Sequence, residues 1–338
     1  RFAGGQTSIL RIGTELAKRG IEVGYGVYKN QSKEEMELCA SSNLRDYQGA
    51  VYTKQEIVRM VKNPQEQPDV VIASSWDTVH YVKKFSCYRM YFVQDFEPYF
   101  YPFGDKFLMA KKTYEQGLHM VSLGNWNKKE IEKHCAPVSP IDCVEFPCEL
   151  REYPYIKRDY AAYAEKKKLV MAVYLKYYGK RLPSTIQFML GKVKDAFEQR
   201  DGIVLDIRYF GEAKSFIPKN GVNVGMLNKE ELNALYAEAD FGMVASLSNI
   251  SLIPYEMLAT GLPLIEFEDG TFQEFFPENC ALLTSLSWKD LYLQMKACLE
   301  EPVRLAMYDA NARTYLETLS WEKTGKQFYD ILSELTLG

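Results

Sequence analysis

The stretch that decides the fold is Ser248-Asn249-Ile250-Ser251-Leu252-Ile253-Pro254-Tyr255-Glu256-Met257-Leu258-Ala259-Thr260-Gly261-Leu262-Pro263-Leu264-Ile265. It lies between the apolar runs 241–245 and 264–267. This order predicts a strand, a polar loop, a short helix, a glycine stop and a second strand. Ser251 suits the N-cap of the helix, and Pro254 suits its first turn, where a missing N–H is tolerated. A helix that connects two buried strands is typical of a parallel α/β sheet.

The start of this short helix predicts an anion site. The backbone amides from Asn249 to Leu252 would point out of the helix N-terminus, which suits a diphosphate. Glu256, further along the helix, would accept hydrogen bonds from the two hydroxyls of a ribose. In the alternative, Glu256 has only a favourable interaction with the helix dipole.

The same alternation of strands and helices extends over almost the whole chain. Strands are predicted at 21–28, 68–75, 88–95, 119–122, 169–174, 204–210, 222–225, 241–245 and 264–267. Helices are predicted at 7–19, 184–199 and 229–238 and through the tail 286–337. The periodicity fades around 145–165, which we interpret as a linker. The expected organisation is an N-terminal domain at 1–150 and a C-terminal domain at 151–318.

Composition narrows the class of protein. Of 338 residues, 47% are hydrophobic and 25% charged, as in globular proteins, and the net charge of −4 argues against a nucleic-acid binder. The sequence contains no run of eighteen apolar residues, which is about the length that a helix needs to span a bilayer. The seven cysteines form no CxxC pair and the three histidines show no metal-ligand spacing, so we expect a reduced cytoplasmic setting and no metal. The Lys111-Lys112 and Lys128-Lys129 clusters predict either a solvated face or a contact with an anionic partner, such as a membrane surface.

Residues 256–263, Glu-Met-Leu-Ala-Thr-Gly-Leu-Pro, closely resemble the second half of the E-x7-E region of retaining GT-B glycosyltransferases. The resemblance implies an α/β GT-B fold, in which two Rossmann-like domains face each other across a cleft. Ser248 replaces the first glutamate of the motif, which in the family helps to hold the donor sugar. Ser320-Trp321 resembles the start of the family's last helix, so residues 319–338 are expected to return to the N-terminal domain.

A more specific resemblance covers nearly the whole chain. The segments 91–102 and 251–256 are similar to those of the WsaF-like rhamnosyltransferases, which extend bacterial surface polysaccharides from a nucleotide-activated L-rhamnose. This implies a hexosyltransferase that is retaining and metal-independent, takes a dTDP-linked donor and needs no cofactor. Gly4-Gly5 resembles the family's glycine loop and would contact the donor. The family's first strand precedes this loop, and the chain opens at Arg1 as if an upstream segment were missing.

Candidate acceptor residues follow the strand at 88–95. Gln94, Asp95 and Glu97 would meet a cleft at the end of this strand, where acids orient or deprotonate an acceptor hydroxyl. Phe96 and Tyr99 would stack on sugar faces. The alternatives are a structural turn whose acids cap the next helix, and aromatic residues that belong to the core.

Candidate donor residues lie in the C-terminal domain. Arginine clamps phosphate oxygens and lysine supplies a point charge, so the basic residues after the strand at 169–174 would bind the diphosphate, unless they are only surface charges. The glycines that end the next two strands resemble the family's base-binding loops. The donor set is Gly4, Gly5, Lys176, Arg181, Gly211, Gly225, Met226, Asn249, Ile250, Ser251, Leu252, Tyr255 and Glu256. The residues assigned to catalysis are Asp95, Glu97, Lys180 and Glu256.

The function implied is transfer of L-rhamnose from a dTDP-activated donor to a glycan acceptor. Other nucleotide-sugar donors, a nucleotide-sugar epimerase and an inactive binding homologue remain as alternatives, the last because of Ser248. The resemblance leaves open a lipid-linked acceptor, a peripheral contact with the inner face of the cell membrane, and a homodimer.

Overall fold

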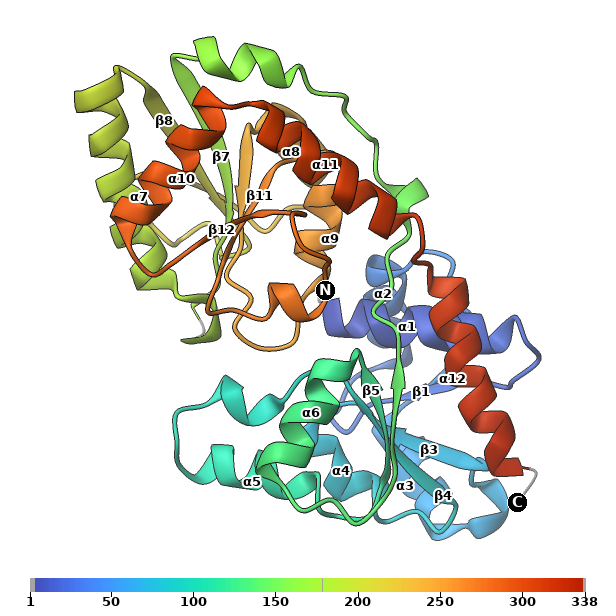
Figure 1. The fold of residues 1–338 in the computed structure, drawn as a ribbon. Helices are drawn as coiled ribbons and strands as arrows, with labels where there is room; N and C mark the ends of the chain where they lie inside the picture. Colours follow the sequence, from blue (N-terminus) through green and yellow to red (C-terminus); the bar gives the residue numbers. More distant parts are fainter. Residues whose placement is uncertain (1–3, 178, 337–338) are drawn as a thin grey trace. The chain divides into compact units, whose positions relative to one another are not determined.

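The chain divides at Pro147 and again at Leu319 (Figure 1). The computed structural model describes residues 4–177 and 179–336. The first unit runs to Pro147 and takes in the C-terminal segment from Ser320, and the second unit is Cys148–Leu319. The sequence placed these boundaries at 150 and 318. Each unit carries its own parallel sheet.

The first unit is built on a four-stranded parallel sheet in the order β3-β4-β5-β6. These strands are Val70–Ala73, Tyr88–Val93, His119–Leu123 and Ile141–Val144. A separate parallel pair consists of β1 (Gly24–Gly26) and β2 (Ala50–Tyr52), so the strand predicted at 21–28 is shorter and belongs to a small sheet of its own. The apolar pattern did not reveal β2, which is three residues long, or β6, where Asp and Cys interrupt the apolar run.

Seven helices are described in the first unit, within residues 4–147 and 320–336. They are α1 (Gly4–Ala17), α2 (Lys33–Asn43), α3 (Lys54–Lys62), α4 (Trp76–Val82), α5 (Asp105–Thr113), α6 (Asn125–His134) and α12 (Trp321–Thr336). Helices α2 and α3 begin at capping boxes, in which a Ser or Thr and a Glu three residues later satisfy each other's free amides. Because α1 begins at Gly4, Gly4 and Gly5 form a helical turn, which corrects the expected glycine loop.

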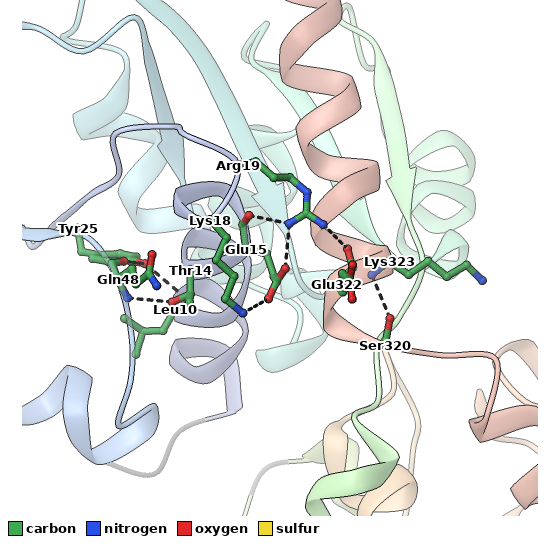
Figure 2. A network of polar contacts seen from close by, with 10 residues as sticks. All are labelled: Leu10, Thr14, Glu15, Lys18, Arg19, Tyr25, Gln48, Ser320, Glu322 and Lys323. Carbon is green, nitrogen blue, oxygen red and sulfur yellow. Dashed lines mark hydrogen bonds and ion pairs between the residues drawn. The ribbon is translucent and has the colours of Figure 1, made fainter.

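The C-terminal helix α12 packs on α1 within the first unit, through the polar network that Figure 2 shows. Glu15 of α1 accepts hydrogen bonds from Lys18 Nζ at 2.7 Å and Arg19 Nη1 at 2.9 Å. Arg19 Nη2 in turn donates to the carbonyl of Glu322 in α12 at 3.1 Å. Burial opposes ionisation of Glu15, but these two cations hold the pKa of its carboxyl below the ordinary value.

The two helices approach closely because α12 carries a glycine at their contact. A Cβ at Gly325 would lie 2.3 Å from Cβ of Glu15, which is closer than van der Waals contact permits. The buried face of α12 also includes Trp321, Thr324 and Phe328. The Phe328 ring meets the ring of Phe92 in β4 edge-on, with centroids 5.6 Å apart. The C-terminal segment is thus part of the core of the first unit.

The second unit is built on a six-stranded parallel sheet in the order β12-β11-β10-β7-β8-β9. In chain order, β7 to β12 are Lys168–Tyr174, Val204–Phe210, Val222–Gly225, Phe241–Met243, Leu264–Phe267 and Leu282–Thr284. Its helices are α7 (Pro183–Ala196), α8 (Lys229–Glu238), α9 (Leu252–Ala259), α10 (Trp288–Glu300) and α11 (Val303–Leu316). The predicted ranges of β8, β9, α8 and β11 match the structure residue for residue. The short strand β12 was not predicted.

The packing of α12 on α1 predicts the effect of one substitution. Gly325→Ala adds a methyl group that has no room against Glu15, so we expect a loss of about 1–3 kcal/mol of stability, although alanine is the better helix former. Thermal unfolding measures it. The control is Gly104→Ala, whose Cβ would meet its nearest atom at 3.9 Å. If Gly325→Ala unfolded at or above the wild-type temperature, the close contact would be wrong.

Candidate functional site

In the second unit, the order in which the chain adds strands to the sheet reverses at β7. This reversal of strand order defines the candidate site. From β7 the chain first adds β8 and β9 on one side and then β10, β11 and β12 on the other. The switch point therefore lies between β7 and β10, and parallel α/β sheets bind ligands in the crevice at such a point, outside the carboxyl ends of the strands. The predicted donor residues of this unit follow or end the strands β7, β8, β9 and β10 at that edge.

Arg181 connects the loops on both sides of the switch point. It ends the short 3-10 helix Gly179–Arg181, after β7, and its Nη1 donates to the carbonyl of Ala245, after β10, at 2.8 Å. The guanidinium stands over the Tyr174 ring at 5.4 Å, and the residue is 6% exposed. A buried guanidinium held in this way is a fixed positive charge, of the kind that binds phosphate oxygens. Lys176 and Lys180 belong to the same loop and are half-buried.

Glu266 was not predicted as a site residue, and it holds the loop after β10 in place from the neighbouring strand β11. Its carboxylate accepts hydrogen bonds from Ser246 Oγ at 2.6 Å and from Ser246 N at 3.0 Å. Glu266 is fully buried, and this burial raises the pKa of its carboxyl to about 7 against the opposing effects of the Ser246 bonds and the Arg181 charge. A charged residue in the middle of a buried strand is the sequence signal that could have singled it out.

Thr271 holds the same loop from its other side. Its amide donates to the carbonyl of Ser246 at 2.7 Å, and its hydroxyl has the carbonyls of Ser246 and Ser248 as the two acceptors for its one proton. The chain between β10 and α9 is therefore bonded to β11 and to the segment after it. Such a loop presents its amides in a set geometry and does not have to be ordered by a ligand.

The N-terminus of α9 carries the backbone amides that the sequence predicted as an anion site. Ser251 is the N-cap, with extended backbone angles (φ −99°, ψ 173°), and the helix begins at Leu252. The first amides of a helix have no intrahelical acceptor. Within residues 4–177 and 179–336, the Ser251 hydroxyl is buried without a hydrogen-bond partner. The side chains of Asn249 and Ile250 are buried, so their contribution to an anion site is limited to the backbone.

Glu256 lies one turn further along α9 in a ring of tyrosines. The Tyr153 hydroxyl donates to its Oε1 at 3.4 Å. Burial raises the pKa of the Glu256 carboxyl to about 7, while the hydrogen bond from Tyr153, the charge of Lys229 and the nearby Tyr236 hydroxyl act in the opposite direction. A carboxyl that titrates near neutral pH inside an α/β crevice is typical of a functional group. The sequence predicted Glu256 but neither tyrosine nor Lys229.

The two glycines predicted to line a base-binding site lie next to each other. Gly211, after β8, donates its amide to the carbonyl of Gly225, at the end of β9, at 2.9 Å. Both have positive φ angles, +101° and +90°. A Cβ on Gly211 would lie 2.7 Å from the ring of Tyr174, so only glycine fits there. Met226 follows them and is exposed.

One predicted donor residue needs a correction. Tyr255 was expected beside the sugar or base, but it is 1% exposed and its ring packs on Phe276 with centroids 4.6 Å apart. Its side chain is part of the core of the second unit, because it occupies the inward face of α9.

In the first unit, the acceptor candidates follow β4 as expected, but Glu97 is engaged in the protein. Its Oε1 accepts from the Tyr91 hydroxyl at 2.7 Å and its Oε2 from the amide of Trp76, the first residue of α4, at 2.9 Å. Burial raises the pKa of Glu97 to about 7. Glu97 thus caps α4, which precedes it in the chain, and not the next helix, as the structural alternative expected. Its catalytic role, like that of the buried Asp95, stays a prediction.

The two aromatic acceptor candidates differ in their burial. Phe96 is 1% exposed and stacks on Tyr114 with ring centroids 5.5 Å apart, which corrects its expected stacking on a sugar: it is a core residue. Tyr99 is exposed, and its hydroxyl donates to Glu130 at 2.8 Å. Gln94 lies beside the start of α1, since a Cβ on Gly5 would be 3.5 Å from Oε1 of Gln94. Two segments far apart in the sequence thus meet at the end of β4.

Among residues 4–177 and 179–336, no group of three or more His, Cys, Asp or Glu side chains is placed to hold a metal ion. In the same residues, no helix is both long enough and apolar enough to cross a membrane.

The fold is that of the GT-B glycosyltransferases. HepE from Anabaena, solved with UDP and glucose, superposes with a TM-score of 0.75 at 12% identity, over 99% of this chain and 97% of its own. Sucrose-phosphate synthase from Thermosynechococcus elongatus gives 0.74 at 13% identity, over 97% of this chain and 92% of its own. WaaG, a glycosyltransferase involved in lipopolysaccharide biosynthesis, gives 0.65 at 14% identity, over 98% and 96%.

A sequence relative is also found. The O-antigen biosynthesis protein RfbC of Myxococcus xanthus is 24% identical over 280 residues, which cover 78% of this chain. The match spans only 21% of the length of RfbC. No protein-family model matches the chain.

The buried Glu266 carboxyl predicts a pH dependence of stability. Its folded pKa of about 7 lies above the unfolded value of 4.5, so its contribution is present below pH 4.5 and is lost as the pH rises through 7. Between pH 8 and pH 6 the folded state should gain on the order of 1 kcal/mol from this group. Glu266→Gln should remove that part of the gain in thermal unfolding at both pH values.

The matched control is Glu268→Gln, two residues further on and exposed, which should leave the pH dependence of the wild type intact. An unchanged pH dependence in Glu266→Gln would contradict the raised pKa.

Proposed function

We propose that the protein transfers a sugar from a nucleotide-activated donor to a glycan. The observation that carries this proposal is the arrangement at the switch point, where the N-terminus of α9 follows β10 and the fixed guanidinium of Arg181 comes from the loop after β7. The GT-B fold supports the same conclusion, because HepE was solved with a nucleotide and a sugar.

The diphosphate would bind to the amides at Ser251 and Leu252 and to the loop after β7. Negative charge develops on the departing diphosphate during glycosyl transfer, and preorganised donors lower the energy of that state. Arg181 would contact two phosphate oxygens, with Lys176 and Lys180 as further cations. The unpartnered Ser251 hydroxyl, buried in the described part of the chain, would donate to a third oxygen.

The nucleoside would lie along the edge formed by β8, β9 and α9. Gly211 and Gly225 bring bare backbone to this edge, where a base can approach closely, and Met226 would cover it. Glu256 would accept from both ribose hydroxyls. Only the ionised carboxylate accepts two hydrogen bonds without donating one, so donor binding would draw a proton away from Glu256.

The donor sugar and acceptor follow from the resemblance and the relatives. We propose L-rhamnose from a dTDP-linked donor, transferred with retention and without a metal or cofactor to a bacterial surface polysaccharide, and RfbC supports the polysaccharide. Asp95 and Gln94 would position the acceptor, which would be lipid-linked at a cytoplasmic membrane face. The HepE complexes favour a second candidate, a UDP-hexose donor.

A panel of nucleotides tests the donor site. A ligand that binds only the folded state raises the unfolding temperature. We expect a rise with dTDP and dTDP-L-rhamnose, and a loss of that rise in Arg181→Ala and in Glu256→Ala. A rise with UDP and UDP-glucose alone would keep the site and discard rhamnose. No rise with dTDP, UDP, GDP or NAD would reject the donor site.

The raised pKa of Glu256 predicts how nucleotide binding varies with pH. Because the ionised form binds the diol, affinity for the preferred nucleoside diphosphate should fall about tenfold per unit below pH 7, as the carboxyl of the free protein takes up its proton. Isothermal titration at pH 6 and pH 8 measures this. Glu256→Gln should bind more weakly at pH 8 and show a flatter profile.

The matched control for this titration is Glu230→Gln, an exposed carboxylate on the neighbouring helix α8. It should titrate like the wild type. A pH dependence that persisted in Glu256→Gln would assign the effect to another group, and the role of Glu256 would be wrong.

A further inference from the structure

Helix α5 of the first unit exposes apolar and basic side chains together. Leu108 and Met109 are 51% and 57% exposed, and Phe103, just before the helix, is 81% exposed. Lys106, Lys111 and Lys112 lie on the same nine-residue helix. We call these six residues the α5 surface. Their positions give the apolar side chains and the lysines a common outward side, because residues 108, 109 and 112 are three and four apart.

The α5 surface is held in place by its own neighbours. The Phe103 ring contacts the ring of Phe107 at 5.3 Å between centroids, and Lys106 Nζ stands 5.7 Å from the centroid of Tyr101. Ala110, on the opposite side of the helix, is fully buried and anchors α5 in the unit. Figure 1 shows α5 (teal) on the other side of the first unit from α1 and α12. The exposed side chains therefore belong to a fixed outer helix.

The surface around α5 also carries an excess of basic residues. A shallow, open hollow of about 430 Å³ is lined by Leu108, Met109, Lys111, Lys112 and Glu115. Lys83, which follows α4, reaches Gln116 just beyond α5, with 2.6 Å between its Nζ and Oε1. Four lysines thus meet two carboxylates, Asp105 and Glu115, and Glu115 is paired with Lys112. This local excess of positive charge lies on a chain whose net charge is −4.

We propose that the α5 surface docks on a lipid bilayer that contains anionic headgroups. Exposed phenylalanine, leucine and methionine enter the headgroup boundary, while the lysines pair with lipid phosphates. A second copy of this chain fits less well, because a symmetric contact of α5 with itself would bring lysines to face lysines. Docking would hold the first unit at the membrane, and it does not depend on the proposed transferase activity.

Vesicle co-sedimentation tests this proposal. The full chain should bind vesicles of phosphatidylcholine mixed with phosphatidylglycerol, bind phosphatidylcholine alone far more weakly, and be released by salt. Lys111→Gln/Lys112→Gln should lower the affinity about 30-fold, at about 1 kcal/mol for each lysine near the surface. Leu108→Glu/Met109→Glu should abolish binding.

The controls change equally exposed residues elsewhere. Phe188→Glu removes a phenylalanine that is 61% exposed, and Lys62→Gln/Lys289→Gln removes two exposed lysines; both variants should bind vesicles like the wild type. Unchanged unfolding temperatures verify that the α5 variants fold. Absence of vesicle binding by the wild type, or binding that the α5 variants retain, would overturn the proposal. So would a vesicle-free dimer, seen by light scattering, that the α5 variants dissociate.

Discussion

The candidate site depends on the paired hydrogen bonds between the Glu266 carboxylate and the amide and hydroxyl of Ser246. They determine where the chain goes after β10, and with it where α9 begins. Thr271 and Arg181 bond to the same loop from two other segments. The cost of burying these charged groups is offset only while the bonds are intact. A loop fixed in this way can present backbone amides to an anion at little cost in conformational entropy.

The candidate site contains two carboxyl groups, those of Glu256 and Glu266, whose pKa values are raised. Glu256 and Glu266 both titrate near pH 7 because burial outweighs the hydroxyl and amide donors around them. They differ in what they contact: Glu266 is fully buried and accepts two hydrogen bonds from Ser246, while Glu256 is partly exposed and accepts one, from the Tyr153 hydroxyl. The first supports the shape of the loop, and the second is the carboxyl that we propose for the ribose.

Much of the fold could be predicted from the sequence, because long apolar runs are unambiguous. β8, β11 and α8 match their predicted ranges, while three-residue strands such as β2 carry too little pattern to detect. Contacts between residues far apart in the sequence were harder to predict. The sequence predicted Glu256 from a local motif and Arg181 from its place after a strand, but the hydroxyl bonded to Glu256 comes from Tyr153, about a hundred positions away. Burial also decided what local chemistry could not: Phe96 and Tyr255 lie in cores, since aromatic residues serve packing and binding equally well.

Hydrogen exchange with and without a nucleoside diphosphate tests the central claim most directly, because it reports on individual backbone amides. Bound dTDP or UDP should slow exchange at the start of α9, from Ser251 to Leu252, and in the loop after β7 that holds Arg181. Protection at those two loops together would show that the diphosphate occupies the switch point between β7 and β10. Binding without any protection there, or protection confined to the first unit, would contradict it.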